Sequence, residues 1–392
     1  MPAATTFSEL GVDDQLVKVL AASSIDTPFP IQSLTIPNAL AGRDVCGKAK
    51  TGSGKTLAFG LPMLMKTAPA PPSHPHALVL VPTRELALQV TEVLDPLAKA
   101  IGLRVGTIYG GADLDRQVRR LARGLDVVVA TPGRLIDLID RDAVSLETVR
   151  ILVVDEADRM ADMGFLPQVE WLLRHMAKER QTLLYSATLD AAVNRIVSRY
   201  MREPVYCEVE SPQVTVAEME HRFNKVHELD KPLVAAAIVR GADKALLFVR
   251  TKRMADRLAV ALREAGVNAR AIHGDLPQST REQALNGFAA GTIHALVATD
   301  VAARGLDIEG LDVVVHYDPP EDHKAYLHRS GRTARAGESG IVATLVLWNE
   351  ELAVERLQRR VGLRSPIVEM FSNDPRLRDL AHWHPEGTSG VA

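Results

Sequence analysis

The stretch ILVVDEADRM, residues 151–160, places four apolar residues directly before the carboxylates of Asp155, Glu156 and Asp158. A short apolar run rich in β-branched residues is typical of a strand buried inside a parallel sheet. Such a strand delivers the residues after it to the carboxyl edge of the sheet, where α/β folds bind ligands. Taken alone, the acidic cluster is also typical of the first turn of a helix, where negative charge is favourable.

Similar apolar runs recur along the chain, with helical segments between them. In the first half they are HALVLV (76–81), RVGTIY (104–109), DVVVAT (126–131) and QTLLYSAT (181–188). In the second half they are KALLFVRT (244–251), NARAIHG (268–274), HALVATD (294–300), DVVVHYD (312–318) and GIVATLVL (340–347). Strands that alternate with helices predict βαβ units and parallel sheets. The fold class is therefore α/β, with two domains that each hold a mostly parallel sheet flanked by helices.

Length and local composition give the domain limits. A chain of 392 residues exceeds what one hydrophobic core usually serves. The polar, proline-containing stretch VESPQVTVAEME (209–220) is the expected boundary. We therefore expect a first domain at 1–210 and a second at 211–364, followed by a short C-terminal extension at 365–392.

Composition narrows the class of protein. The formal net charge of −3 provides no general attraction to nucleic acid, so any such binding must use a local groove. Cys46 and Cys207 lie far apart without a CxxC pattern, which favours small core residues over a disulfide framework or a zinc site. The N-terminus lacks a signal-peptide pattern, and no apolar stretch approaches the roughly 20 residues of a membrane span. We expect a soluble cytoplasmic protein.

The stretch AKTGSGKT, residues 49–56, is a variant of the phosphate-binding P-loop, with Ala49 in place of the usual glycine. Gly52 and Gly54 allow close approach of the backbone to phosphates, while Lys55 meets the charge of the β- and γ-phosphates. The hydroxyl of Thr56 is the expected magnesium ligand.

If the P-loop binds a nucleotide, the acidic sequence DEAD (155–158) after the apolar run has a chemical role. Asp155 is the expected second magnesium ligand, and Glu156 is placed to orient and deprotonate the attacking water. Asp158 stands too far along the next helix to share that metal, so we assign it to contacts with neighbouring motifs.

In these motifs and their order, the chain resembles the DEAD-box RNA helicases of helicase superfamily two. The resemblance runs from Phe7 to about Leu347. Besides AKTGSGKT and DEAD it rests on PTRELA (82–87), GG (110–111), TPGR (131–134), SAT (186–188), LLFVRT (246–251), HGDLPQSTREQAL (273–285), ATDVAARGLDI (298–308) and HRSGRTARAG (328–337). It implies two RecA-like domains, RNA-stimulated hydrolysis of ATP with Mg²⁺, and local, non-processive unwinding of RNA.

The resemblance also implies nucleotide contacts. Gln32 matches the residue that reads adenine through its amide, which offers both a donor and an acceptor. Ile25 and Phe7 match the stacking residue and the upstream aromatic. The remaining nucleotide-binding positions of the resemblance are Gly52, Ser53, Gly54, Lys55, Thr56, Gly305 and Asp307, the last of which matches a ribose contact.

Arginines and small polar residues complete the implied site. Arg332 and Arg335 match arginine fingers that stabilise charge on the transferred phosphoryl group. Ser186 and Thr188 match a motif that couples ATP to RNA through Asp158. The implied RNA contacts are Arg84, Gly111, Thr131 and Arg134 in the first domain and Thr251, Gly274, Arg281 and Thr299 in the second. Amides, hydroxyls and arginines suit phosphate and 2′-hydroxyl contacts, so no base specificity is expected.

Three alternatives stay open at this point. The chain could be a non-catalytic, ATP-dependent RNA clamp, a DNA helicase of the same superfamily, or a P-loop ATPase with unrelated cargo. Intact Glu156, Arg332 and Arg335 argue against the clamp, and the motifs of the second half argue against the third. The RNA acted on and any protein partner are not identified, and a monomer is the default expectation.

Overall fold

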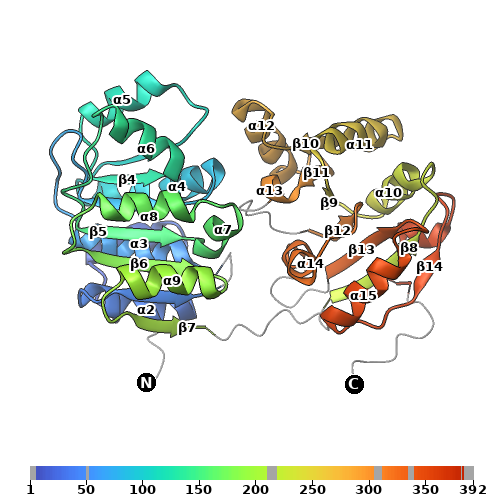
Figure 1. Ribbon diagram of the computed structural model, residues 1–392, viewed down its shortest axis with the longest axis horizontal. Coiled ribbons are helices and arrows are strands. Elements are labelled where there is room, and N and C mark those ends of the chain that lie inside the picture. The colour runs from blue at the N-terminus through green and yellow to red at the C-terminus, as the bar shows by residue number, and fades with distance from the viewer. Residues whose placement is uncertain are drawn as a thin grey trace. The chain divides into compact units, whose positions relative to one another are not determined.

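A computed structural model describes residues 6–49, 53–209, 219–303, 311–333, 340–380 and 382–383. The chain divides into two compact units, Met1–Ser211 and Pro212–Ala392, each built on its own seven-stranded sheet (Figure 1). Every described strand pairing in both sheets is parallel. The predicted α/β fold class is confirmed.

The sheet of the first unit has the strand order β3-β4-β2-β5-β6-β1-β7. Its strands are β1 (Val45–Lys48), β2 (Ala77–Leu80), β3 (Val105–Ile108), β4 (Val127–Ala130), β5 (Ile151–Asp155), β6 (Gln181–Ser186) and β7 (Val205–Glu208). Its helices are α1 (Asp14–Ala22), α2 (Pro30–Leu40), α3 (Lys55–Lys66), α4 (Arg84–Ala100), α5 (Leu114–Ala122), α6 (Pro132–Asp140), α7 (Ala157–Asp162), α8 (Leu166–Arg174) and α9 (Ala191–Tyr200).

Helices cover both faces of this sheet, so strands β2 and β4 are apolar at every position. In β4, Val127 and Val129 join the core formed with helices α1 to α4, while Val128 and Ala130 join the core formed with α5 to α9. Successive residues of a strand point to opposite faces, and this alternation explains why runs such as VVVA are buried throughout.

The second unit repeats this plan with the strand order β10-β11-β9-β12-β13-β8-β14. Its strands are β8 (Met219–Lys225), β9 (Ala245–Val249), β10 (Ala269–Ile272), β11 (Ala295–Thr299), β12 (Val313–His316), β13 (Gly340–Val346) and β14 (Ile367–Glu369). Its helices are α10 (Lys231–Arg240), α11 (Lys252–Glu264), α12 (Gln278–Ala289), α13 (Asp300–Ala303), α14 (His323–Ser330), α15 (Glu351–Val361) and a 3₁₀ helix (Pro375–Arg378).

Residues 367–380, which the sequence analysis assigned to a C-terminal extension, form part of the second unit. Strand β14 pairs with β8 at the edge of the sheet, and Leu377 and Leu380 are buried against the core that includes α10. The segment had no recognisable periodicity because its strand is three residues long and its helix is four. The extension therefore needs correction over these residues.

The structure also describes the two cysteines and the hydropathy of the helices. Cys46 and Cys207 are free and buried, as expected of core residues, and burial raises the pKa of Cys46 to about 11. Among the helices of the described ranges, none is both long and apolar enough to cross a membrane.

Candidate active site

The carboxyl edge of the first sheet carries the motifs of the first unit in two neighbouring groups. Strands β5, β6 and β1 are adjacent, and they lead into the DEAD, SAT and P-loop residues. Strands β3, β4 and β2 form the other half of the sheet and lead into the residues expected to contact RNA. A single sheet edge thus presents both sets of side chains.

The P-loop leaves strand β1 and enters helix α3 through Gly54. This residue has a φ of 82°, in the left-handed region that favours glycine. A Cβ there would overlap the side chains of Gln32 and Phe29, so glycine is needed for space as well as for conformation. Lys55 begins the helix, is 6% exposed, and donates from Nζ to the carbonyl of Ala49 at 3.2 Å.

Gln32 joins the segment before the P-loop to the P-loop itself. Its Oε1 accepts a hydrogen bond from the amide of Phe29 at 2.7 Å, and its Nε2 donates to the carbonyl of Gly54 at 2.9 Å. The side chain is buried, while Ile25 nearby in sequence is 38% exposed. One lone pair and one N–H of the amide have these protein partners, which fixes its orientation beside the loop.

Phe7 has a different environment from the one expected for a nucleotide contact. It is 1% exposed and belongs to the core formed with helices α1 to α4. In this structure the ring packs inside the first unit, and the assignment of Phe7 to nucleotide binding stays a prediction.

Asp155 is the last residue of β5 and is almost completely buried. Its Oδ1 accepts a hydrogen bond from the amide of Glu156 at 2.9 Å. Burial raises the pKa of this carboxyl to about 6, and the positive charge of Lys55 opposes that shift. The carboxylate of Asp155 is therefore held near the first turn of α3, where a cation would favour its ionised form.

Glu156 and Arg159 form a buried ion pair beside Asp155. Glu156 precedes helix α7 with a φ of 54°, and its Oε2 accepts from Arg159 Nη1 at 2.6 Å. Their side chains are 7% and 8% exposed, respectively. Arg159 was not predicted from the sequence. Its position three residues after Glu156, at the spacing at which helical side chains meet, could have indicated this ion pair.

Asp158 connects the segment after β5 to the SAT residues at the end of β6. Contacts with neighbouring motifs were expected for this residue from the sequence. Its Oδ2 accepts from the amide of Thr188 at 2.9 Å and from Thr188 Oγ1 at 3.2 Å. Its own amide donates to Ser186 Oγ at 3.1 Å, and Ser186 Oγ donates to the carbonyl of Thr188 at 2.7 Å. The carbonyl of Ser186 accepts from the amide of Ala49, which extends the connection to the P-loop.

The four residues of the first unit expected to contact RNA lie at the ends of strands β2, β3 and β4. Arg84 begins α4, and its guanidinium lies against Gly111, whose φ of 84° and lack of a Cβ permit the contact. Thr131 caps α6, and Arg134 on that helix donates to the carbonyl of Ala112 at 3.1 Å. The structure brings these positions to one half of the sheet edge.

The second unit gathers its candidate residues at the ends of the adjacent strands β10, β11 and β9. Thr251 caps α11, Gly274 follows β10 and is exposed, and Thr299 ends β11. Arg281 lies on α12 and is buried, with 6% of its surface exposed. Arg332 follows α14 and is half-buried.

Arg329 is a buried arginine of the HRSGR motif that sequence reasoning did not single out. Its Nε and Nη2 each donate to one carboxylate oxygen of Asp300 at 2.7 Å, and Nη1 donates to the carbonyl of Asp318 at 2.7 Å. This bidentate pair joins α14 to α13 and holds the segment that carries Arg332.

Four predicted nucleotide-site residues lie outside the described residues: Gly52, Gly305, Asp307 and Arg335. Within the described part of the chain, no group of three or more histidine, cysteine or acidic side chains could hold a metal ion. The candidate metal ligands, Asp155 and Thr56, offer one carboxylate and one hydroxyl. Oxygen donors of this kind suit a hard cation that keeps water and phosphate ligands, as Mg²⁺ does.

Comparison with known proteins adds independent information. The family model described as DEAD/DEAH box helicase matches residues 29–196, and the model described as helicase conserved C-terminal domain matches residues 224–337.

Two curated relatives are named as RNA helicases. The DEAD-box ATP-dependent RNA helicase CshA of Geobacillus kaustophilus is 44% identical over 91% of this chain and 76% of its own length. The ATP-dependent RNA helicase CshA of Listeria monocytogenes is 45% identical over 87% of this chain and 66% of its own length.

Two solved structures resemble the chain over most of its length. That of Saccharomyces cerevisiae Dbp5 bound to RNA and ADP BeF3 has a TM-score of 0.82 at 29% identity, covering 96% of this chain and 98% of that one. That of a DEAD box protein from Methanococcus jannaschii has a TM-score of 0.52 at 32% identity, covering 94% and 99%.

Proposed function

The chain belongs to the DEAD-box family of ATP-dependent RNA helicases, and on that premise we propose that it hydrolyses ATP to bind, locally unwind and release structured RNA without processive movement. The observation that carries the proposal is the shared sheet edge of the first unit. ATP-site residues end strands β5, β6 and β1, and candidate RNA contacts end β3, β4 and β2.

The buried cation of Lys55 is placed to meet phosphate charge at the start of α3, where the free amides of the helix N-terminus also favour an anion. We assign the holding of Mg²⁺ to Asp155 and Thr56. When bound, the ion supplies charge neutralisation at the phosphates. The buried carboxylate of Asp155 fits this assignment because a nearby cation offsets the cost of ionising it.

Glu156 is our candidate for the base that accepts the proton of the attacking water. Its carboxylate is buried beside Asp155, and the ion pair with Arg159 holds it in one orientation. The bond to Arg159 uses Oε2, and either oxygen of the carboxylate can receive the proton. We assign stabilisation of charge on the transferred phosphoryl to Arg332 and Arg335 of the second unit.

The bonds of Asp158 to Thr188 support a coupling role between the ATP site and bound RNA. These bonds join the residues after β5 to those after β6, so a displacement of one segment is resisted by the other. The RNA contacts proposed for Arg84, Gly111, Thr131 and Arg134 use guanidinium, amide and hydroxyl groups. Such groups bind phosphate and sugar, which explains recognition without base specificity.

We also propose four further details of the activity. These are contact of Gln32 and Ile25 with adenine, a requirement for Mg²⁺, a monomeric state and action in the cytoplasm. The two hydrogen bonds of Gln32 to Phe29 and Gly54 leave one N–H and one lone pair of its amide for a base, which supports the adenine contact.

Strand separation tests the proposal. The purified chain is mixed with a short RNA duplex that carries a single-stranded overhang, and release of the labelled strand is followed with ATP, with ADP and without nucleotide. We expect ATP-dependent release that declines steeply as the duplex is lengthened. Release that is independent of duplex length would contradict non-processive unwinding, and ATP-dependent RNA retention without release would favour the clamp.

A further inference from the structure

A cavity of about 480 Å³ lies at the amino edge of the first sheet, on the side opposite the candidate active site. Its lining residues precede or begin four neighbouring strands: Asp44 before β1, Arg150 before β5, Gln181 at the start of β6, and Arg202 before β7. We call it the amino-edge pocket. Because all these strands are parallel, their active-site ends lie at the far edge, about 15 Å away for strands of four to six residues.

Arg180 is the residue of this pocket whose environment is hardest to explain without a ligand. It is 9% exposed, and its one hydrogen bond from the side chain goes from Nη1 to the carbonyl of Ala177 at 2.8 Å. Its buried Nε has no partner, and it forms no ion pair with any described residue. A guanidinium in this position has lost hydration without gaining an ion pair, which is costly unless an anion replaces the water.

Three exposed arginines line the pocket with Arg180. Arg43, Arg150 and Arg202 likewise form no ion pair within the described ranges. Arg202 Nη2 donates to the carbonyls of Lys178 at 3.0 Å and Arg180 at 3.2 Å, which orients its guanidinium. The pocket therefore collects four guanidinium groups that lack a carboxylate partner.

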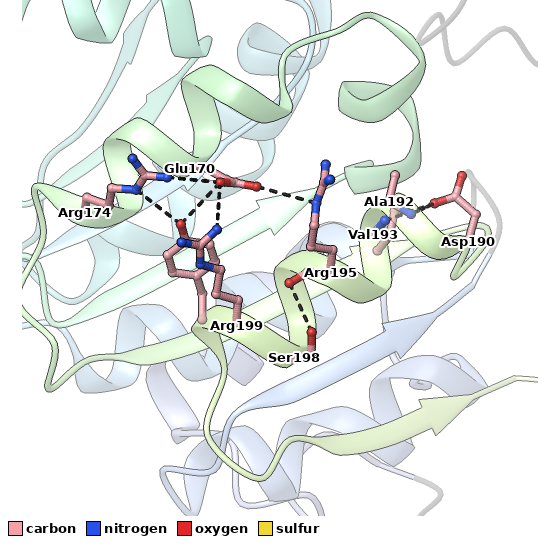
Figure 2. Close-up of polar contacts among 9 residues, drawn as sticks. Glu170, Arg174, Asp190, Ala192, Val193, Arg195, Ser198 and Arg199 are labelled. Carbon is pink, nitrogen blue, oxygen red and sulfur yellow. Dashed lines mark hydrogen bonds and ion pairs between the residues drawn. The ribbon is translucent and has the colours of Figure 1, made fainter.

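Another group of arginines in the same unit shows the contrasting arrangement. Figure 2 shows Arg174, Arg195 and Arg199 of helices α8 and α9 around Glu170. Their distances to the Glu170 carboxylate are 3.3, 3.7 and 3.6 Å. These three arginines thus share a protein anion, whereas the four that line the amino-edge pocket form no ion pair within the described residues.

The carboxylates of the pocket form no ion pair with its arginines, although the negative charge of Asp44 favours the charged form of Arg180. Asp44 uses its two oxygens to accept from the amides of Thr182 and Arg202, both at 2.7 Å. Glu179 and Glu203 are exposed and pair with none of the lining arginines. Four arginines against three carboxylates leave the lining with a formal charge of +1, and Arg180 is the buried member of the four unpaired arginines.

We propose that the amino-edge pocket binds a small anion of the phosphate class, such as inorganic pyrophosphate or the phosphate groups of a small metabolite. Guanidinium groups present planar pairs of N–H donors that match phosphate oxygens, and several converging guanidinium groups favour a multiply charged anion over a single carboxylate. The site is separate from the ATP site because it lies at the other edge of the sheet.

Isothermal titration of the full chain with inorganic pyrophosphate tests this proposal. The chain is first saturated with ADP, so that the P-loop is filled and its occupancy is verified independently. We expect one further binding event in the wild type. The variant Arg43→Ala/Arg150→Ala, which changes exposed residues only, should bind about tenfold more weakly or worse, and Arg180→Gln should lose binding.

Arg195→Ala is the matched control, since it removes an exposed arginine of the same unit that pairs with Glu170, and its affinity for pyrophosphate should equal that of the wild type. If Arg180→Gln does not fold, the double variant decides alone. The proposal is overturned if ADP-saturated wild type does not bind pyrophosphate, or if the double variant binds as the wild type does.

Two further arms identify the ligand class. Citrate that binds as tightly as pyrophosphate would overturn the preference for phosphate. Single-stranded RNA that displaces pyrophosphate, with weaker RNA binding by Arg43→Ala/Arg150→Ala, would assign the pocket to the RNA backbone and overturn a small-anion site. ADP binding is measured before pyrophosphate is added. Failure of ADP to bind would count against the proposed function.

Discussion

At the scale of single residues, the bonds of Asp158 define the connection between the two halves of the proposed activity. The motif DEAD identified the carboxylate from sequence, because a charged group after a buried strand is positioned at the sheet edge. Its partner atoms on Thr188 could not be predicted from spacing, since 30 residues separate the two positions and only the pairing of β5 with β6 brings them together. The contact of Gln32 with Gly54 could not be predicted for the same reason, because the two residues are distant in sequence.

Replacing Asp158 by asparagine tests this connection. The asparagine side chain keeps one oxygen but lacks the negative charge of the carboxylate. In the wild type that carboxylate accepts hydrogen bonds from both the backbone amide and the hydroxyl of Thr188. We expect RNA unwinding to fall about tenfold or more, while ATP hydrolysis without RNA changes by less than about twofold. Both rates are measured on one preparation.

Asp162→Asn serves as the control because Asp162 is an exposed residue of the same helix α7. Equal losses in unwinding and in RNA-free hydrolysis for Asp158→Asn would mean that Asp158 supports the ATP site as a whole and does not couple it to RNA.

At the scale of elements, the ten strands expected from apolar runs are all present, because a strand covered on both faces is hydrophobic throughout. Those runs did not include β1, β7, β14 or β8, the last of which has the polar sequence MEHRFNK. In β8, the buried His221 is bonded to Tyr326 and the buried Arg222 donates to the carbonyl of Leu380, whereas neither polar atom of the buried Asn224 side chain has a hydrogen-bond partner among the described residues. Burial in this strand therefore does not require apolar residues. A position at the edge of the sheet and a buried polar sequence both remove the run of apolar residues by which a strand is recognised in the sequence.

The integration of residues 367–380 into the second unit predicts the effect of Leu377→Ala. This side chain is 1% exposed in the core beside α10, so its truncation should lower the free energy of unfolding by about 2–4 kcal/mol. Phe371→Ala, at a position that is 54% exposed, should change it by no more than about 0.5 kcal/mol. Urea unfolding followed by tryptophan fluorescence measures both. Equal, small effects would restore the description of this segment as an appendage.

A buried histidine on β12 predicts a pH dependence of the second unit. His316 is fully buried, its Nδ1 is 3.2 Å from Thr344 Oγ1, and Arg329 and His221 are its charged or titratable neighbours. Burial, followed by Arg329, lowers its pKa well below the usual value. The unfolded chain therefore binds the proton more readily, so this contribution to stability is complete above about pH 6.5 and is lost as the pH falls below it.

Hydrogen exchange of β12 and β13 peptides measures that loss. Below pH 6.5 the free energy of opening should decline by up to about 1.4 kcal/mol per pH unit from this one group. His316→Gln should remove the corresponding part of the slope. A variant whose slope equals that of the wild type would show that other groups control the acid sensitivity of the unit.

At the scale of the whole molecule, the central claim is that one chain combines an ATP site with a sequence-independent RNA surface. The family and the α/β class followed from motif order and strand pattern, since both depend on residues close in sequence. The ion pairs of Arg159 and Arg329, and the buried position of Phe7, depend on contacts that only folding creates.

ATP hydrolysis by the purified chain with and without single-stranded RNA tests this claim most directly, with DNA of the same sequence and Glu156→Gln as controls. We predict strong stimulation by RNA, little by DNA, and a loss of about 100-fold or more in Glu156→Gln, since that variant lacks the base but keeps the volume of the side chain. Equal stimulation by DNA, or turnover in Glu156→Gln that matches the wild type, would contradict the account.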